Sequence, residues 1–445
     1  MRRPSPSQSV QYVKICSLYG AGFYYIPGTD TCIKIGGYVR AEADFNANGS
    51  YNPFRSQNFD DPAKNDETTR VRYGITADVR SQTEYGTLRG YLTIFPTATN
   101  GTAVGGSPYE PIFAPAGFIQ FAGFTAGKTA SFFDFDLQPY SNITNFWGSN
   151  QAGNGIPLLA YTAQFGNGFS ASLSVEDTTV RRSAVVGPIG AGGTSTYAGR
   201  EWPDIVANLH VDQAWGSAQI MGAVHDVTGY TATTVATSSA TGWAVGGGVK
   251  FNLPMIGKGD YVITQVEWAK GALNYLGSNF GTGAFGETLS NGYPTVTSAA
   301  VGPVYDAVGN GTGYDLGSGW SITGGFEHHW VPNWKTSLYG SYGKIEYSQA
   351  ASTAIAGVAG IAAGPAATAD AGWSYWNIGS RTVWTVVPNL DLSVDVVYQS
   401  GQTAFGGLPC AGTAVATGSA LAAGCTFQDK SFWAGIVRAQ RNFYP

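Results

Sequence analysis

The stretch IKIGGYVRAEADF, from Ile33 to Phe45, decides the fold class. Its odd-numbered residues are all apolar or small, and its even-numbered residues are nearly all polar, among them Lys34, Arg40 and Glu42. Successive side chains of a β-strand point to opposite faces. The stretch is therefore predicted to be a strand with one apolar face and one polar face.

The same alternation recurs from Arg70 to Arg80 and again from Trp433 to Gln440. Sixteen such segments can be laid out, joined by seven short turns and eight long connections. The short turns are expected at Thr83–Gly86, Thr125–Lys128, Gly166–Gly168, Ala214–Gly216, Asn252–Gly259, Val331–Trp334 and Val387–Asn389. The long connections are expected at Asn46–Asp66, Pro96–Pro115, Asp134–Ile156, Thr179–Glu201, Val227–Thr241, Lys270–Gly319, Tyr347–Gly372 and Gly401–Asp429. Short turns at one end and long loops at the other are typical of outer-membrane barrels.

The composition agrees with this architecture. Charged residues make up 12% of the chain, about half of the roughly 25% usual in soluble proteins. Aromatic residues reach 13%, and the mean hydropathy is -0.06. No stretch offers the roughly 20 strongly apolar residues of a membrane-spanning helix; the uncharged run from Tyr347 to Ala369 is broken by glycines and is interpreted as a loop. In a transmembrane barrel lipid-facing and lumen-facing residues alternate, so their hydropathies cancel.

The predicted fold is therefore all-β, a 16-stranded antiparallel transmembrane β-barrel with short periplasmic turns and long outer loops. Residues 1–31 are expected to form an N-terminal periplasmic segment and residues 32–445 a single barrel. Met1–Ser7 is basic, but no apolar segment follows it, so it is not a signal peptide. Because an outer-membrane protein must be exported, we expect either that the true start lies further upstream or that the signal has been replaced.

Several other classes are disfavoured. The net charge of -5 and the lack of a basic cluster speak against a nucleic-acid partner. No CxxC motif occurs, so neither a metal site nor a cofactor is expected. An enzyme is not expected either: His210 and Asp212 share a strand face, but no GxSxG motif accompanies them.

The four cysteines form two close pairs, Cys16 with Cys32 and Cys410 with Cys425. In a protein of an oxidising compartment, two local pairs are interpreted as two disulfides. The alternative is four unrelated free thiols.

Four segments resemble the alphaproteobacterial general porins of the outer membrane (porin-2 type). The most specific is VKICSLYGAGFYYIPGTDTCIKIGGYVR (Val13–Arg40), and the others are Gly117–Phe135, Pro157–Asp177 and Ile436–Pro445. The resemblance implies a sixteen-stranded barrel that associates as a homotrimer, with the third outer loop folded into the lumen. It also implies a water-filled channel through which small hydrophilic solutes and ions diffuse passively across the outer-membrane lipid. One departure from outer-membrane proteins generally is that Tyr444 and Pro445 follow the aromatic Phe443.

The functional site of such a channel is its narrowest cross-section. The resemblance places the inward loop at 134–156, and its candidate residues are Asp134, Asp136, Asn142 and Asn145. Arginines on the polar face of the first three strands would form an opposing basic wall, made of Arg40, Arg70, Arg72, Arg80 and Arg89. Opposing charge rows would sort charged and dipolar solutes.

For each candidate a purely structural role stays open. Some of the arginines would then pair with Glu42, Asp44 or Asp78 inside the wall. Asp134 and Asp136 would likewise anchor the base of the loop through hydrogen bonds.

Two further functions also stay open: a solute-selective outer-membrane channel, and an adhesin or structural barrel that acts through its outer loops. Stepwise conductance in planar bilayers separates a pore from an adhesin with a plugged lumen.

Overall fold

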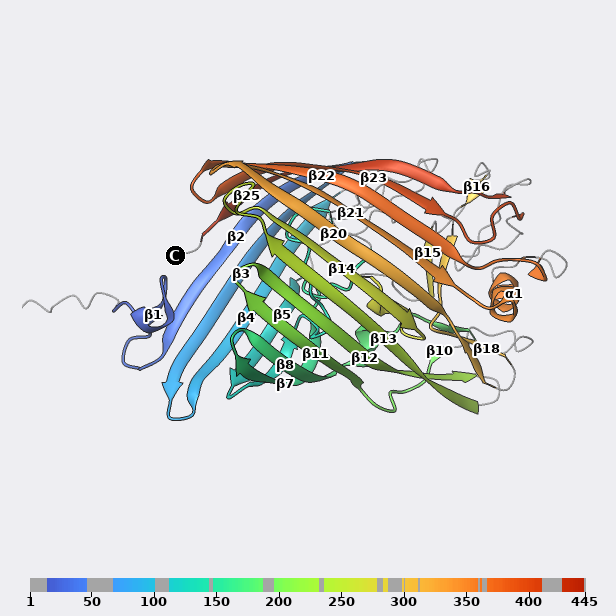
Figure 1. Ribbon diagram of the computed structural model, residues 1–445, viewed down its shortest axis with the longest axis horizontal. Coiled ribbons are helices and arrows are strands. Elements are labelled where there is room, and N and C mark those ends of the chain that lie inside the picture. Colours follow the sequence, from blue (N-terminus) through green and yellow to red (C-terminus); the bar gives the residue numbers. More distant parts are fainter. Residues whose placement is uncertain are drawn as a thin grey trace, which may run out of the picture.

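The computed structural model describes residues 14–45, 67–100, 112–143, 147–186, 196–231, 236–277, 283–286, 298–299, 301–310, 313–358, 361, 366–409 and 426–443. Sixteen antiparallel strands form a closed barrel (Figure 1). They are β2 (Cys32–Phe45), β3 (Glu67–Thr83), β4 (Gly86–Asn100), β5 (Ile112–Phe121), β6 (Phe124–Thr129), β7 (Ile156–Gly166), β8 (Phe169–Glu176), β11 (Asp204–Gln213), β12 (Gly216–Thr231), β13 (Ala236–Asn252), β14 (Tyr261–Lys270), β20 (Ser318–Val331), β21 (Trp334–Glu346), β22 (Trp373–Val387), β23 (Leu390–Gln402) and β25 (Lys430–Asn442). The ring closes because β2 pairs with β3 on one side and with β25 on the other.

Closure and alternation explain how this sheet lies in a membrane. Every backbone group in hydrocarbon must be paired within the protein, and only a closed sheet has no free edge. On β2, Ile35 and Val39 are 45% and 44% exposed on the outer face, whereas Glu42 and Asp44 point inward and are buried. The predicted alternation and the predicted 16-stranded barrel are confirmed.

Six of the seven short turns lie where the sequence pattern predicted them. The turn predicted at Thr125–Lys128 was wrong, because these residues belong to β6 and pair with Gln120 and Gly117 of β5. The chain turns instead at Ala122 and Gly123, whose φ angles are 48° and 86°. A tight two-residue hairpin turn of this kind needs positive φ at both central positions, which glycine adopts without strain.

The long loops at the other end contain short elements of their own. These are η2 (Thr178–Val180), β9 (Val185–Val186), β10 (Thr196–Tyr197), η3 (Leu273–Tyr275), β15 (Gly283–Gly286), β16 (Ser298–Ala299), β17 (Val301–Val304), β18 (Ala307–Gly309), β19 (Tyr314–Leu316), α1 (Gln349–Val358) and β24 (Thr426–Phe427). The stretch Tyr347–Ala369, predicted to be a loop, therefore contains a short helix, which its alanines favour. None of the helices in the described ranges has the length and apolar character to cross a membrane.

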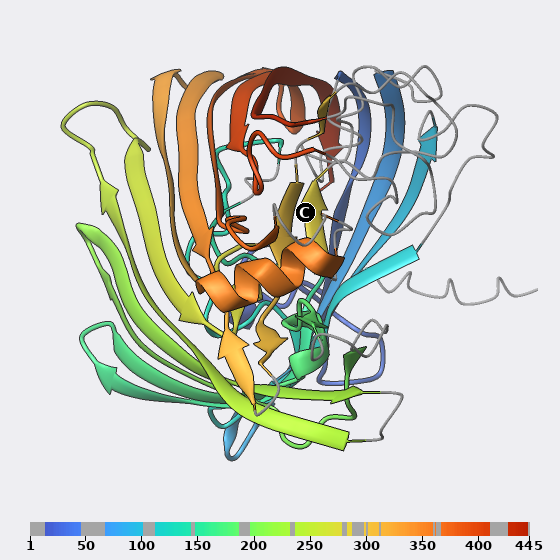
Figure 2. The same cartoon turned by 90° about the vertical axis from the view of Figure 1, so that its right-hand side faces the viewer.

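Helix α1 lies across the opening at the long-loop end of the barrel (Figure 2). Beneath it, side chains from several loops pack into one buried cluster that includes Trp147, Leu273, Tyr275, Ile355 and Phe405. The outer loops therefore form a folded cap with a hydrophobic core of its own.

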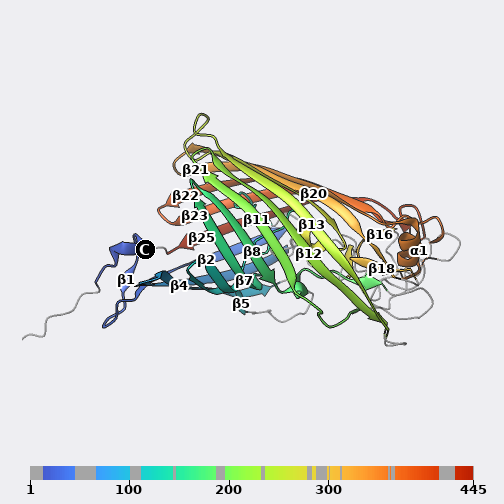
Figure 3. The same cartoon turned by 60° about the horizontal axis from the view of Figure 1, so that its bottom comes forward.

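The N-terminal segment lies at the opposite, short-turn end, next to the C-terminus (Figures 1 and 3). It contains η1 (Ser17–Tyr19) and β1 (Tyr24–Tyr25), and β1 pairs with the first residues of β2. Cys16 and Cys32 form a disulfide, as predicted. The other predicted pair, Cys410 with Cys425, lies outside the described residues.

Candidate functional site

The loop between β6 and β7 runs through the barrel interior and is bonded to inward-facing residues of distant strands. The backbone N–H groups of Phe135 and Asp136 both donate to the side-chain oxygen of Gln265 on β14, at 3.0 and 2.7 Å. Further along the loop, the backbone N–H of Asn142 donates to Asp395 on β23 at 2.5 Å. The loop therefore lies against the inner wall on the β14 to β25 side.

Trp147 is the largest buried anchor of this loop. Its indole N–H donates to the backbone oxygen of Tyr375 on β22 at 2.8 Å, and its ring stacks on Trp373 with centroids 5.5 Å apart. A Cβ at Gly343 on β21 would lie 2.5 Å from the indole. Only glycine at this position leaves room for the ring.

Asp134 and Asp136 both hold the loop itself together. Asp134 accepts hydrogen bonds from the Ser149 hydroxyl at 2.6 Å and from the Gln151 backbone N–H at 2.6 Å, and thus joins the two ends of the loop. It also forms an ion pair with Arg181, at 3.0 Å, and both side chains are fully buried.

Asp136 is likewise fully buried, and it accepts hydrogen bonds from the Tyr140 hydroxyl at 2.6 Å and from the Gln138 backbone N–H at 2.8 Å. Burial raises the pKa of Asp136 to about 6. The contacts of both carboxylates are therefore those of residues that anchor the loop. This is the structural role that the sequence left open for Asp134 and Asp136.

Asn142 also bonds through its side chain, both to β23 and to one further strand, β25. Its side-chain N–H donates to the Ser393 hydroxyl on β23 at 2.9 Å, and its side-chain oxygen accepts from Arg438 on β25 at 2.6 Å. Asn145, the fourth candidate of the loop, lies outside the described residues.

The part of the basic wall nearer the long loops surrounds Glu42. Arg70 lies opposite Glu42 in the pairing of β2 with β3, and the two form an ion pair whose side chains are both fully buried. Arg438 donates to the other oxygen of Glu42, at 2.5 Å. The charge of Arg70 is therefore offset inside the wall.

Arg40 and Arg72 lie next to this group on β2 and β3, where they are paired with each other in the strand register. Arg40 is half-buried, donates to the side-chain oxygen of Gln440 at 2.7 Å and lies 4.6 Å from the centre of the Tyr38 ring. Arg72 is buried and donates to the Thr97 hydroxyl at 2.9 Å.

The part of the basic wall nearer the short turns consists of two arginines that share one carboxylate. Arg80 and Arg89 pair with Asp78 at 2.7 and 2.9 Å, and each guanidinium side chain keeps 27% of its surface exposed. Arg89 also donates to Gln120 at 2.8 Å and lies 5.0 Å from the centre of the Tyr91 ring. The pair of arginines leaves a net positive charge on the inner face of β3 and β4.

The structure also assigns positions to residues that were not singled out from the sequence. Gln265 and Asp395 hold the loop, and both lie in the inward phase of their strands, so the alternation carries a signal for them. Arg181 follows η2 in a loop and reaches Asp134 across 47 positions of sequence. No local pattern points to that pairing.

Comparison with known proteins agrees with this architecture. Residues 4–436 match the family model of the porin subfamily. The chain is 28% identical over 223 residues to the porin Omp2b of Brucella abortus (strain 2308) and 29% identical over 224 residues to that of Brucella suis biovar 1. Each match covers 48% of this chain and 56% of the relative, so the chain spans about half the length of the curated relatives that it matches.

Among solved structures, the outer-membrane channel DcaP of Acinetobacter baumannii has a similar fold. Its TM-score is 0.60 at 14% identity, and the match covers 94% of this chain and 99% of that one. The match of the family model over nearly the whole chain shows that the protein belongs to the porin subfamily, whose members are integral β-barrels of the bacterial outer membrane.

Proposed function

We propose that this protein is an outer-membrane porin, a water-filled channel for the passive diffusion of small hydrophilic solutes and ions. The observation that carries the proposal is a closed barrel, apolar outside and polar inside, whose inner loop is bonded to the inner wall of β14 to β25. A barrel of sixteen to eighteen strands is wide enough to leave an aqueous channel.

We place the narrowest passage between this loop and the inner face of β2 to β5. Arg40, Arg80 and Arg89 project from that face and stay partly exposed, whereas Arg70 and Arg72 are buried. Asp134 and Asp136 fix the opposite boundary by holding the loop in place. Because the exposed charges of the wall are cationic, the passage should favour anions over cations of the same size.

Conductance in planar bilayers tests the function directly. A porin gives stepwise current increments, and liposomes that contain it swell in isosmotic sugar solutions at rates that fall with sugar size. Complete absence of conductance from a correctly folded barrel would refute the proposal and leave the adhesin or structural barrel.

One observation favours a solute-selective channel as a second candidate. The cap at the long-loop end has its own buried core, and α1 lies across the opening. A cap of this kind narrows the entrance. A selective channel would show saturable flux for one class of solute, whereas a general pore sorts solutes by size and charge alone.

We further propose that the protein is a homotrimer in which the β5 to β8 face contacts a second copy. A membrane-spanning strand needs about 9–11 residues, but β6 has six residues and β8 has eight. The wall is therefore too low here to face lipid across the full hydrocarbon thickness.

The side chains of this face support the same arrangement. Lys128 on β6 lies two residues after Ala126, which pairs with Ile119 and Leu159, both of them exposed on the outer face. Lys128 therefore also points outward, where lipid contact near the bilayer midplane would cost about 2–4 kcal/mol. A neighbouring subunit removes that cost.

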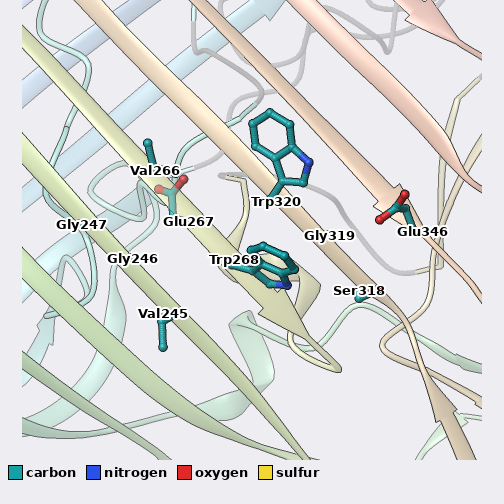
Figure 4. Close-up of a pocket in the computed structure, with 10 residues that line it drawn as sticks. All are labelled: Val245, Gly246, Gly247, Val266, Glu267, Trp268, Ser318, Gly319, Trp320 and Glu346. Atoms are coloured by element: carbon teal, nitrogen blue, oxygen red, sulfur yellow. The ribbon is translucent and has the colours of Figure 1, made fainter.

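The distribution of tryptophan supports the opposite face as the one in contact with lipid. The chain has no tryptophan before Trp147, and the exposed tryptophans lie on β12 to β25 and their turns. Trp376, Tyr398 and Trp433 form a continuous row with centroids 5.4 and 5.1 Å apart. Trp268 and Trp320 flank a groove of the outer surface (Figure 4). Rows of aromatic residues of this kind lie at membrane–water interfaces.

A further inference from the structure

The N-terminal hairpin from Cys16 to Cys32 contacts cationic residues on the inner face of the barrel. Cys32 is the first residue of β2 and pairs with Arg80 of β3, and its side chain forms the disulfide with Cys16. Cys16, Phe23 and Cys32 are at most 5% exposed and form a small hydrophobic cluster, against which Tyr19 packs. The disulfide therefore holds the hairpin beside Arg80.

Two aromatic rings of the hairpin lie against Arg80. The guanidinium carbon lies 5.0 Å from the centre of the Phe23 ring and 5.7 Å from that of the Tyr19 ring. The Nζ of Lys34 donates to the backbone oxygen of Ala21 at 3.2 Å and lies 6.0 Å from the centre of the Phe23 ring. At an exposed site, each such cation–π contact favours the observed position of the cationic side chain over its other positions by about two- to five-fold.

These contacts connect the hairpin to the basic wall. Arg80 pairs with Asp78, and Asp78 also pairs with Arg89. An aromatic ring, a cation, a carboxylate and a second cation are thus in contact near the short-turn end of β3 and β4, where Arg80 and Arg89 are paired across the two strands. Movement of the hairpin would change the positions of two lumen-facing charges, those of Lys34 and Arg80.

We propose that this disulfide-closed hairpin is a collar that determines the ion preference of the pore at its periplasmic mouth. Tyr19, Phe23 and the Ala21 carbonyl hold Arg80 and Lys34 at fixed positions, and the Cys16–Cys32 bond holds the hairpin. The inference rests on the proposed porin function, and it assigns a positioning role to residues outside the inner loop.

Two variants test the collar. Cys16→Ser with Cys32→Ser releases the hairpin, and Phe23→Leu removes one ring but keeps the disulfide. We expect the anion-over-cation permeability ratio, from the reversal potential in a KCl gradient, to fall by about two-fold or more in both, in line with the loss of one or more cation–π contacts.

The controls separate the collar from other effects. Leu18→Ser changes a residue of the same segment that is 64% exposed, and should leave the reversal potential unchanged. Reductant added to single wild-type channels should reproduce the shift and have no effect on the Cys16→Ser, Cys32→Ser variant. This comparison removes any contribution from Cys410 and Cys425.

Folding is checked for every variant by heat-dependent mobility on SDS gels, and Phe23→Leu keeps the test valid if the double variant does not fold. An unchanged reversal potential in folded, conducting Phe23→Leu channels would overturn the collar and leave the porin function intact. A wild-type protein that does not conduct at all would instead overturn the porin function.

Discussion

Two arginines on neighbouring strands of the same wall differ in burial and in the groups that they contact. Arg70 and Glu42 form a fully buried ion pair, whereas Arg40 is half-buried and donates to the neutral Gln440. Removal of one partner of a buried pair leaves an uncompensated charge and destabilises by about 3–5 kcal/mol. Position in the wall alone therefore does not identify a residue that acts on solutes.

Arg40→Gln should shift the reversal potential in a salt gradient toward cation preference and leave the barrel stable. The substitution removes a partly exposed positive charge and keeps a side chain that can bond to Gln440. Reversal potential and the unfolding temperature, followed by gel mobility, are the measurements.

Arg70→Gln is the contrasting variant. It should lower the stability, but by less than the roughly 3–5 kcal/mol of a fully broken buried pair, because Glu42 would lose Arg70 and keep Arg438. If Arg40→Gln left the reversal potential unchanged, Arg40 would not line the passage.

The attachment of the inner loop should depend on pH through Asp136. Because the pKa of this carboxyl is raised from 3.8 to about 6, the folded loop binds the proton more tightly than the unfolded chain does. The resulting stabilisation is complete below pH 3.8 and is lost as the pH rises through about 6; it is worth on the order of 3 kcal/mol. Hydrogen exchange of the loop amides should therefore be slower at pH 5 than at pH 7.5, after correction for the intrinsic rates.

Asp136→Asn provides the control for this pH effect, because the amide is nearly isosteric and does not titrate. The corrected exchange of its loop should be the same at the two pH values. Equal corrected rates in the wild type would show that Asp136 does not control the loop.

At the scale of elements, the loop between β6 and β7 is held by buried contacts at several points and not only at its ends. Gln265 holds its first part, Asp395 its middle and Tyr375 its later part through Trp147. A loop bonded in this way behaves as part of the wall. The size of the passage should then depend on these anchors.

Trp147→Ala should loosen the loop. Truncation of a buried tryptophan costs about 3–5 kcal/mol, and the cavity would lie between the loop and β21 to β22, where the indole now packs on Trp373. We expect larger and noisier single-channel conductance, together with faster proteolysis of the loop. Trp330 is 65% exposed and lies at the end of β20, next to a short turn. Trp330→Ala should therefore leave the conductance unchanged. A Trp147→Ala channel with wild-type conductance would contradict the placement of the constriction.

At the scale of the whole molecule, the outer surface divides into two faces. The β5 to β8 side has short strands and an outward lysine, and the β12 to β25 side carries the tryptophans. A lipid-exposed barrel needs neither difference, but a subunit in a closed ring needs one face for protein and one for lipid.

Bulky substitutions distinguish the two faces. Gly117, on β5, has open space at the position of a Cβ, so Gly117→Trp should fold as a monomer but lose the SDS-resistant oligomer. Gly247→Trp, on the outer face of β13 where the nearest atom is 3.5 Å from a Cβ, should keep the oligomer. Retention of the oligomer in the Gly117→Trp variant would place the interface elsewhere.

The alternation of apolar and polar residues determined the strands, their two faces, the number of strands and the end at which the long loops lie. It could do so because side-chain direction along a strand has a period of two residues and is therefore local. Local patterns fail where the signal is not periodic. The turn that lies at Ala122 and Gly123 was predicted at Thr125–Lys128, and the segment that forms α1 was interpreted as a loop.

Only the tertiary structure decided which charges meet. Glu42 faces Arg70 through the register of β2 with β3, and a long connection between two strands does not set that register. Asp134 meets Arg181 because two loops fold into the same interior, and their free energy depends on packing against the wall and not on neighbours in sequence. The alternation thus predicts which residues face the lumen, but the contacts made there determine which of them remain exposed to it.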